Sequence, residues 1–396
     1  MQPSSDFGHS VDAFFEGQRK TLGFYSVWPQ RKRLARILHR INFWHIFGFW
    51  IMGFNLSLLL KLVININQLD EMIRVFVVLA TCIAYTFKVL AIKLNNKEML
   101  ELFGSCHSRH FLPMNIHEQT FFSEARGFSR KMRNYYAGIS FTALNALLLT
   151  QYLIDNTQLP LATYSPLDVS KRSGYYAMYC YQCVALSLSC FVNISFDSLC
   201  SSLFIFVKCQ LDMLALRLNS IGRHQEELKE LQRGDQKQDQ LVQQELISCI
   251  LYYMRIVELA AKMERLLYKP ISAQIFCSVL VLIANFYALS LLSDNYLVFA
   301  KFLTYQCCML LQIFILCYYA GEISQRSLEL KHELYKSNWV GWNKSNRKLM
   351  LLFMLRLENP IRIRTMNANR FIDVALFSSI VNSSYSYFAL LKKVNS

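Results

Sequence analysis

The chain has 396 residues, of which 54% are hydrophobic and only 17% are charged, and its mean hydropathy is +0.23. Soluble proteins usually carry about 25% charged residues, so this composition argues against a soluble protein and indicates an integral membrane protein. The formal net charge is +15, yet no basic run is interleaved with stacking aromatic residues. We therefore assign the excess Lys and Arg to a membrane surface rich in anionic lipid and expect no nucleic-acid partner.

Residues 1–40 are polar and basic, and we expect them to form a cytosolic N-terminal segment. No apolar stretch precedes a small-residue cleavage site in this segment, so the sequence predicts no cleavable signal peptide. Seven Lys and Arg residues lie between Gly17 and Arg40. Under the positive-inside rule, this cluster holds the N-terminus in the cytosol.

Seven apolar segments long enough to cross a bilayer follow in chain order. The predicted spans are residues 41–64, 72–94, 135–154, 174–207, 271–292, 296–320 and 371–391. Pro270 suits the first turn of the fifth span, where a missing backbone N–H costs nothing. A minimal turn at 293–295 joins the fifth span to the sixth, so that residues 270–320 form one hairpin of two spans.

Two long charged regions separate these spans. Residues 208–269 combine leucines at helical intervals with nearly balanced charges, so we predict a cytosolic helical extension with a break near Gly234. Residues 321–370 contain a short helix at 347–357, which we expect Ser345 to cap and Pro360 to end. This second region is predicted to be a cytosolic anchor segment.

The charge distribution gives a consistent topology. The basic connections fall on the same side as the N-terminus, and the small connections fall on the other side. The basic connections are 95–134, 208–269 and 321–370, and the small ones are 65–71, 155–173 and 293–295. An odd number of spans then places the C-terminus outside the cell. A receptor coupled to a G protein has the opposite orientation, and its usual Asp-Arg-Tyr and Asn-Pro-x-x-Tyr motifs are missing from the third and seventh spans.

The cysteines and histidines predict neither a metal site nor a disulfide. Most of the 12 cysteines lie in apolar runs, and the expected outer loops contain none. His107, His110 and His117 are close in sequence, but no metal-ligand or carboxylate–histidine spacing accompanies them. We therefore predict no cofactor, no metal and no catalytic residue, and the chain is not expected to be an enzyme.

The last predicted span, 371–391, is unusually polar. At helical spacing, four polar residues fall on one face, and most of the large apolar side chains lie elsewhere. The four are Ser379, Asn382, Ser383 and Ser386. A polar face at membrane depth must meet other protein or water. Two interpretations remain open from the pattern: a helix packed closely in the bundle through its small residues, or a helix that lines an aqueous pore.

The C-terminal third resembles the insect odorant receptor family. The resemblance is carried by YKSNW at 335–339, RKL at 347–349, Arg356, Pro360, Phe371 and SYSYF at 384–388. It covers about 335–391 at the level of motif and the whole chain at the level of topology. The chain departs from the family at one position. Where the family often has Gly before the last helix, this chain has Ala368, Asn369 and Arg370. Asn tolerates a left-handed backbone better than most residues, so Asn369 is compatible with the same turn.

The resemblance implies an all-α membrane protein with seven transmembrane helices that acts as a tuning odorant receptor subunit. Such a subunit forms a heterotetramer with a shared co-receptor in the plasma membrane of olfactory sensory neurons and gates a cation channel. Volatile odorants would bind in the outer half of region 41–207 and at the sixth span. The candidate ligand-binding residues are Tyr85, Asn145, Tyr175, Tyr179, Tyr305 and Met309, each of which also suits a structural role at an interface or in a bundle core.

The resemblance also implies that the terminal helix of each subunit surrounds one pore. Ile380 and Val381 match the apolar constriction, Asn382 lies beside them, and Ser386 belongs to the same pore-lining set. For Asp373 three roles remain open: it raises the cation concentration at the inner mouth, pairs with Arg370 or caps the start of the helix. The alternatives are a gustatory-type channel of the same superfamily, a receptor coupled to a G protein and a secondary transporter. A secondary transporter often contains inverted repeats, and the sequence shows none.

Overall fold

The computed structural model describes residues 6–28, 33–155, 157–222, 235–291, 296–365 and 370–395. Within these ranges all regular structure is helical, apart from an isolated antiparallel bridge between Arg364 and Phe371. The predicted break near Gly234, the turn at 293–295 and the pair Ala368 and Asn369 lie outside the described residues.

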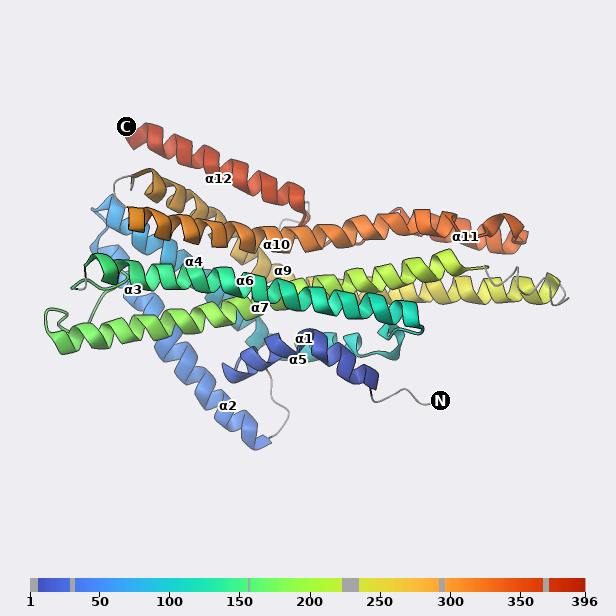
Figure 1. The fold of residues 1–396 in the computed structure, drawn as a ribbon, viewed down its shortest axis with the longest axis horizontal. Coiled ribbons are helices and arrows are strands. Elements are labelled where there is room, and N and C mark those ends of the chain that lie inside the picture. The colour runs from blue at the N-terminus through green and yellow to red at the C-terminus, as the bar shows by residue number, and fades with distance from the viewer. Residues whose placement is uncertain are drawn as a thin grey trace.

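The helices form a long bundle whose members run largely along its long axis (Figure 1). In chain order they are α1 (Asp6–Phe24), α2 (Arg33–His45), α3 (Gly53–Ile64), α4 (Leu69–Leu94), α5 (Asn96–Cys106), α6 (Ile116–Ile154), α7 (Arg172–Ser220), α9 (Asp235–Leu291), α10 (Tyr296–Tyr335), α11 (Lys344–Leu357) and α12 (Val374–Asn395). A π-helix, Ile46–Met52, joins α2 to α3, and short 3-10 turns lie at Arg109–Phe111 and Trp339–Gly341.

Within the described part of the chain, six helical stretches are long and apolar enough to cross a membrane. They are Ile37–Ile64, Glu71–Leu94, Ile116–Ile154, Arg172–Ser220, Asp239–Ser290 and Tyr296–Tyr335. Five of them contain a predicted span in full, and Asp239–Ser290 contains the predicted span 271–292 up to residue 290. The 22-residue α12 corresponds to the seventh predicted span and is not among these six stretches. The chain is therefore an all-α protein with six to seven apolar helices.

Several helices continue far beyond the predicted spans, and the expected helix start at Pro270 is wrong. Pro270 lies inside α9, a single helix of 57 residues and therefore about 85 Å long. A proline inside a helix removes one backbone hydrogen bond. Here α9 packs along α4, α7, α10 and α12, and this packing outweighs the loss of that bond.

The short helix α11 is capped by Asn343, so the predicted cap at Ser345 is wrong. The backbone of Asn343 is extended (φ −66°, ψ 166°), and its side-chain oxygen accepts a 2.8 Å hydrogen bond from the Asn346 backbone N–H. Ser345 already lies in the first turn. The helix begins where the preceding 3-10 turn and the buried Trp342 place it. Ser and Asn both favour the N-cap position, so that preference alone does not determine which of them caps the helix.

Candidate functional site

A cavity of about 100 Å³ lies inside the bundle among α4, α6, α7 and α10. We call it the inner cavity. Most of the surface that lines it is apolar. The residues in its lining that carry a hydroxyl or amide group are Thr81, Tyr85, Tyr136, Ser140, Ser189, Asn193, Tyr305 and Gln312. A small concave site with an apolar wall and a few polar groups suits a small and mainly apolar ligand.

Three of the six candidate ligand-binding residues meet in this cavity. Tyr85 projects from α4, and Tyr305 and Met309 project from α10 one turn apart. Tyr85 and Met309 are buried. These residues come from distant parts of the sequence, and the packing of α4 beside α10 brings them together.

The other three candidates are absent from the lining of the inner cavity. Asn145 is exposed, and its amide donates to the Phe141 carbonyl of its own helix at 2.9 Å. Tyr175 and Tyr179 share one face of α7, as their spacing predicts, with ring centroids 6.0 Å apart. That face meets the loop after α6, where the Tyr175 hydroxyl donates to the Gln158 carbonyl at 3.3 Å.

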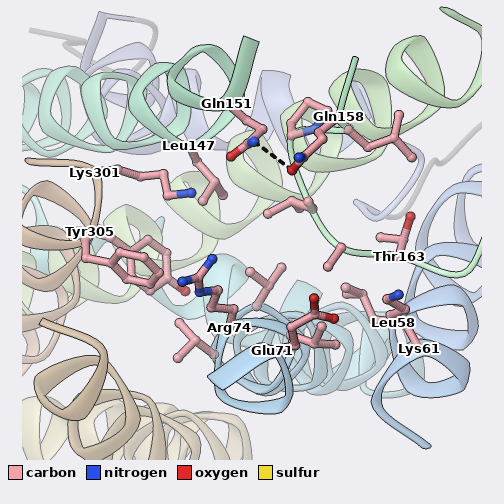
Figure 2. Close-up of a pocket in the computed structure, with 18 of the residues that line it drawn as sticks. Leu58, Lys61, Glu71, Arg74, Leu147, Gln151, Gln158, Thr163, Lys301 and Tyr305 are labelled. Atoms are coloured by element: carbon pink, nitrogen blue, oxygen red, sulfur yellow. Dashed lines mark hydrogen bonds between the residues drawn. The ribbon is translucent and has the colours of Figure 1, made fainter. Parts of the chain in front are cut away.

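A second and larger cavity of about 380 Å³ adjoins the first at one end of the bundle. We call it the end cavity. It is bounded by the end of α3, the starts of α4 and α10, the end of α6 and the loop after α6 (Figure 2). Val78, Leu147 and Tyr305 line both cavities. Tyr305 shares a 2.5 Å hydrogen bond with Thr81 of the inner cavity, so this pair lies where the two cavities adjoin.

A buried network of charged and polar groups forms the floor of the inner cavity. Lys88 of α4 donates 2.6 Å bonds to Asp197 and Asn193 of α7. The other carboxylate oxygen of Asp197 accepts from the Tyr136 hydroxyl of α6 at 3.0 Å and from the Gln312 amide of α10 at 2.5 Å. The network therefore ties together the four helices that surround the cavity.

Sequence reasoning missed Lys88 and Asp197, although a signal for them was present. Their side chains are only 1% and 4% exposed, and each is an isolated charge in a long apolar run. Ionisable residues at such positions are costly and are usually retained for a function or a partner. The sequence alone does not say that these two charges pair with each other, because they lie 109 residues apart.

Helix α12 divides into an inward face and an outward face. Leu376, Ile380 and Ser384 are buried against the bundle, where α12 packs on α9 and α10. Ser379, Asn382, Ser383 and Ser386 are exposed on the opposite side, and Val381 is intermediate. The pore candidates are therefore split: Ile380 is 5% exposed and faces its own chain, whereas Asn382 and Ser386 face outward.

Helix α10 connects the inner cavity with α12. Its residues Tyr305, Met309 and Gln312 line the cavity. Farther along, the Phe314 ring meets the Phe377 ring of α12 at 5.3 Å. Asp373 caps the start of α12 by accepting a 2.8 Å hydrogen bond from the Leu376 backbone N–H, which is one of the three roles expected for it.

Comparisons with known proteins agree on one family. The model of the 7tm Odorant receptor family matches residues 68–385. The chain is 51% identical over 387 residues to Odorant receptor 46a, isoform A, of Drosophila melanogaster, covering 98% of this chain and 99% of that protein. Isoform B is 35% identical over 356 residues, covering 88% and 90% of the two chains.

A solved structure has the same fold. The insect olfactory receptor OR5 from Machilis hrabei superposes with a TM-score of 0.84 over 98% of this chain and all of that one, at 15% sequence identity. The same receptor in complex with eugenol gives a TM-score of 0.80. At this identity the likeness concerns the fold alone.

Proposed function

The chain belongs to the insect odorant receptor family, and from this premise we propose that it is a tuning subunit that gates a cation channel when a volatile odorant binds. The channel forms as a heterotetramer with the shared co-receptor in the plasma membrane of olfactory sensory neurons. Seven helices span the membrane, with the N-terminus in the cytosol and the C-terminus outside. Receptors of this class are not enzymes, and the proposal needs no cofactor.

The odorant occupies the inner cavity. Its apolar wall supplies most of the affinity, because burial of apolar surface is the main driving force for a small volatile molecule. Tyr85, Tyr305 and Met309 contact the ligand, and the cavity volume of about 100 Å³ limits its size. A relative in fold, OR5 from Machilis hrabei, has been solved with eugenol bound. The polar groups on the wall set orientation and selectivity.

One observation carries the proposal: α10 both lines the cavity and packs against α12. A ligand can shift the gating equilibrium only if it binds the open arrangement more tightly than the closed one. A ligand beside Met309 and Gln312 acts on α10, and the contact of Phe314 with Phe377 passes a displacement of α10 to α12. Movement of α12 then opens the pore.

The outward face of α12 lines that pore. Exposed Ser379, Asn382 and Ser386 present hydroxyl and amide groups to permeating cations, and Val381 at the edge of this face narrows the passage. Ile380 supports the wall from behind, because it packs inward. The regions 208–269 and 321–370, which include the start of α9 and all of α11, anchor the subunits to one another in the cytosol.

Cysteine accessibility in the open channel tests the pore assignment. The chain with Asn382→Cys is expressed with its co-receptor, and current is recorded while a charged thiol reagent is applied in the presence of odorant. We expect rapid, irreversible loss of current, because residue 382 faces the ion path. Tyr387→Cys is the matched control, since Tyr387 is also exposed on α12 but points well away from Asn382. If both variants react alike, or neither reacts, α12 does not line the pore.

A further inference from the structure

Three basic side chains converge on the end cavity from three helices. They are Lys61 at the end of α3, Arg74 near the start of α4 and Lys301 near the start of α10. Figure 2 shows Lys301 extending from α10 and Arg74 from α4 toward the same space. Among the described residues, none of these three cations forms an ion pair with a carboxylate.

Among the described residues, one carboxylate lines the same cavity, that of Glu71. Glu71 accepts a hydrogen bond from the Asn65 side-chain amide at the turn between α3 and α4. The cavity therefore presents an excess of positive charge, which focuses its field on a concave and partly apolar space. Lys301 lies over the Phe302 ring at 5.2 Å, and none of the three cations has a carboxylate partner within the described part of the chain. Cations in such a place attract an anion from solution, and a charge-assisted hydrogen bond to Lys or Arg is stronger than a neutral one.

We infer that the end cavity binds the carboxylate of a small organic acid. Its carboxylate lies between Lys301 and Arg74. Its apolar body lies toward the side chains that line both cavities: Val78, Leu147 and Tyr305. An acid with a hydrocarbon chain or ring fits a cavity that is basic at one side and apolar at the other. A neutral molecule with the same skeleton lacks the charge that the cations select. The inference extends the proposed function, because the end cavity adjoins the proposed odorant site.

Direct binding to the purified full-length chain tests this inference without any channel current. The protein is placed in phosphatidylcholine nanodiscs and titrated at neutral pH with tritiated octanoate and, separately, with tritiated methyl octanoate. We expect Lys301→Gln and Arg74→Gln each to raise the dissociation constant for octanoate about tenfold, as expected for the loss of one charge-assisted bond. Binding of the ester is expected to stay unchanged in both variants.

Two further variants serve as controls. Lys301→Arg keeps the charge and should retain octanoate binding, which also shows that substitution at this position leaves the protein folded. Lys171→Gln removes an exposed charge from the loop after α6 outside the end cavity, and it should have no effect. Equal loss of acid and ester binding in Lys301→Gln, or no octanoate binding to the natural chain, would overturn the inference.

A lipid headgroup is the other source of an anion, and nanodiscs containing phosphatidylglycerol distinguish it. If anionic lipid abolishes octanoate binding, the cavity takes a lipid phosphate and the assignment to a small acid is wrong. If octanoate binding persists, the assignment stands. Failure of the proposed channel function would appear differently, as a lack of odorant-evoked current with the co-receptor, and it would leave the binding result readable.

Discussion

At the scale of single residues, the ion pair of Lys88 with Asp197 is almost fully buried. Burying two charges costs several kcal/mol per ion unless they are paired and their remaining hydrogen-bonding capacity is used. Here the carboxylate accepts three bonds, from Lys88, Tyr136 and Gln312. Because both partners are almost fully enclosed, removal of either one leaves an uncompensated charge inside the bundle.

We predict that Lys88→Met destabilises the chain by about 3–5 kcal/mol, the usual cost of breaking a buried pair from one side. The double variant Lys88→Met with Asp197→Leu should recover much of this loss, since no isolated charge remains. Thermal unfolding of purified protein in detergent, followed by fluorescence, measures both effects. Lys97→Met is the control, because Lys97 is exposed at the start of α5 and its loss should change stability little. If Lys88→Met alone is as stable as the double variant, that result contradicts the argument.

At this scale the sequence predicts which residues share a helix face but not how deep they lie or what they meet. Tyr175 and Tyr179 do lie on one face, yet that face packs beside the loop after α6 and not in the inner cavity. Tyr85 and Met309 reach the cavity because α4 and α10 both border it. The spacing of residues within one helix does not predict which side chains of another helix they contact. For the same reason it does not predict the pairing of Lys88 with Asp197.

Helices and their contacts are the next scale, and α10 is the element on which the proposed mechanism depends. It is a 40-residue helix that borders the inner cavity, meets α12 and continues to the region of α11 (Figure 1). A continuous helix transmits a displacement along its length better than segments joined by loops. The sequence predicts the apolar part of α10 but not its continuation through charged residues, because hydropathy reports the membrane boundary and not the helix end.

We predict that Phe314→Ala weakens coupling between ligand and pore and leaves ligand binding intact. An aromatic pair contributes about 0.5–1.5 kcal/mol beyond area burial, so the odorant concentration for half-maximal current should rise several-fold. Radioligand binding to the same cells should be unchanged, since Phe314 is outside the cavity lining. The control is Phe128→Ala, which removes a 6.0 Å ring contact between α6 and Tyr319 of α10. A parallel loss of binding in Phe314→Ala would show that it acts on the ligand site.

For the whole molecule, both cavities and the polar terminal helix fit one orientation in the membrane. The end cavity lies at the end of the bundle formed by the connections after α3 and α6, whereas the N-terminus, α5 and α11 lie toward the other end (Figure 1). The basic clusters predicted to be cytosolic belong to that second end. Lys61, Arg74 and Lys301 at the first end are exceptions to the charge bias, and a site for an anionic ligand accounts for them.

This orientation predicts that a tag at the C-terminus is labelled by antibody on intact cells, and that a tag at the N-terminus is labelled only after the membrane is permeabilised. The reason is the cost of moving the Lys and Arg of residues 1–40 and 321–370 to the outer side against the positive-inside bias. Surface labelling of cells that express the chain with the co-receptor measures both tags, with a cytosolic protein as the control for intact membranes. Labelling of the N-terminal tag on intact cells would show that the chain has the opposite orientation. The end cavity would then open to the cytosol, and an odorant could not reach it from outside.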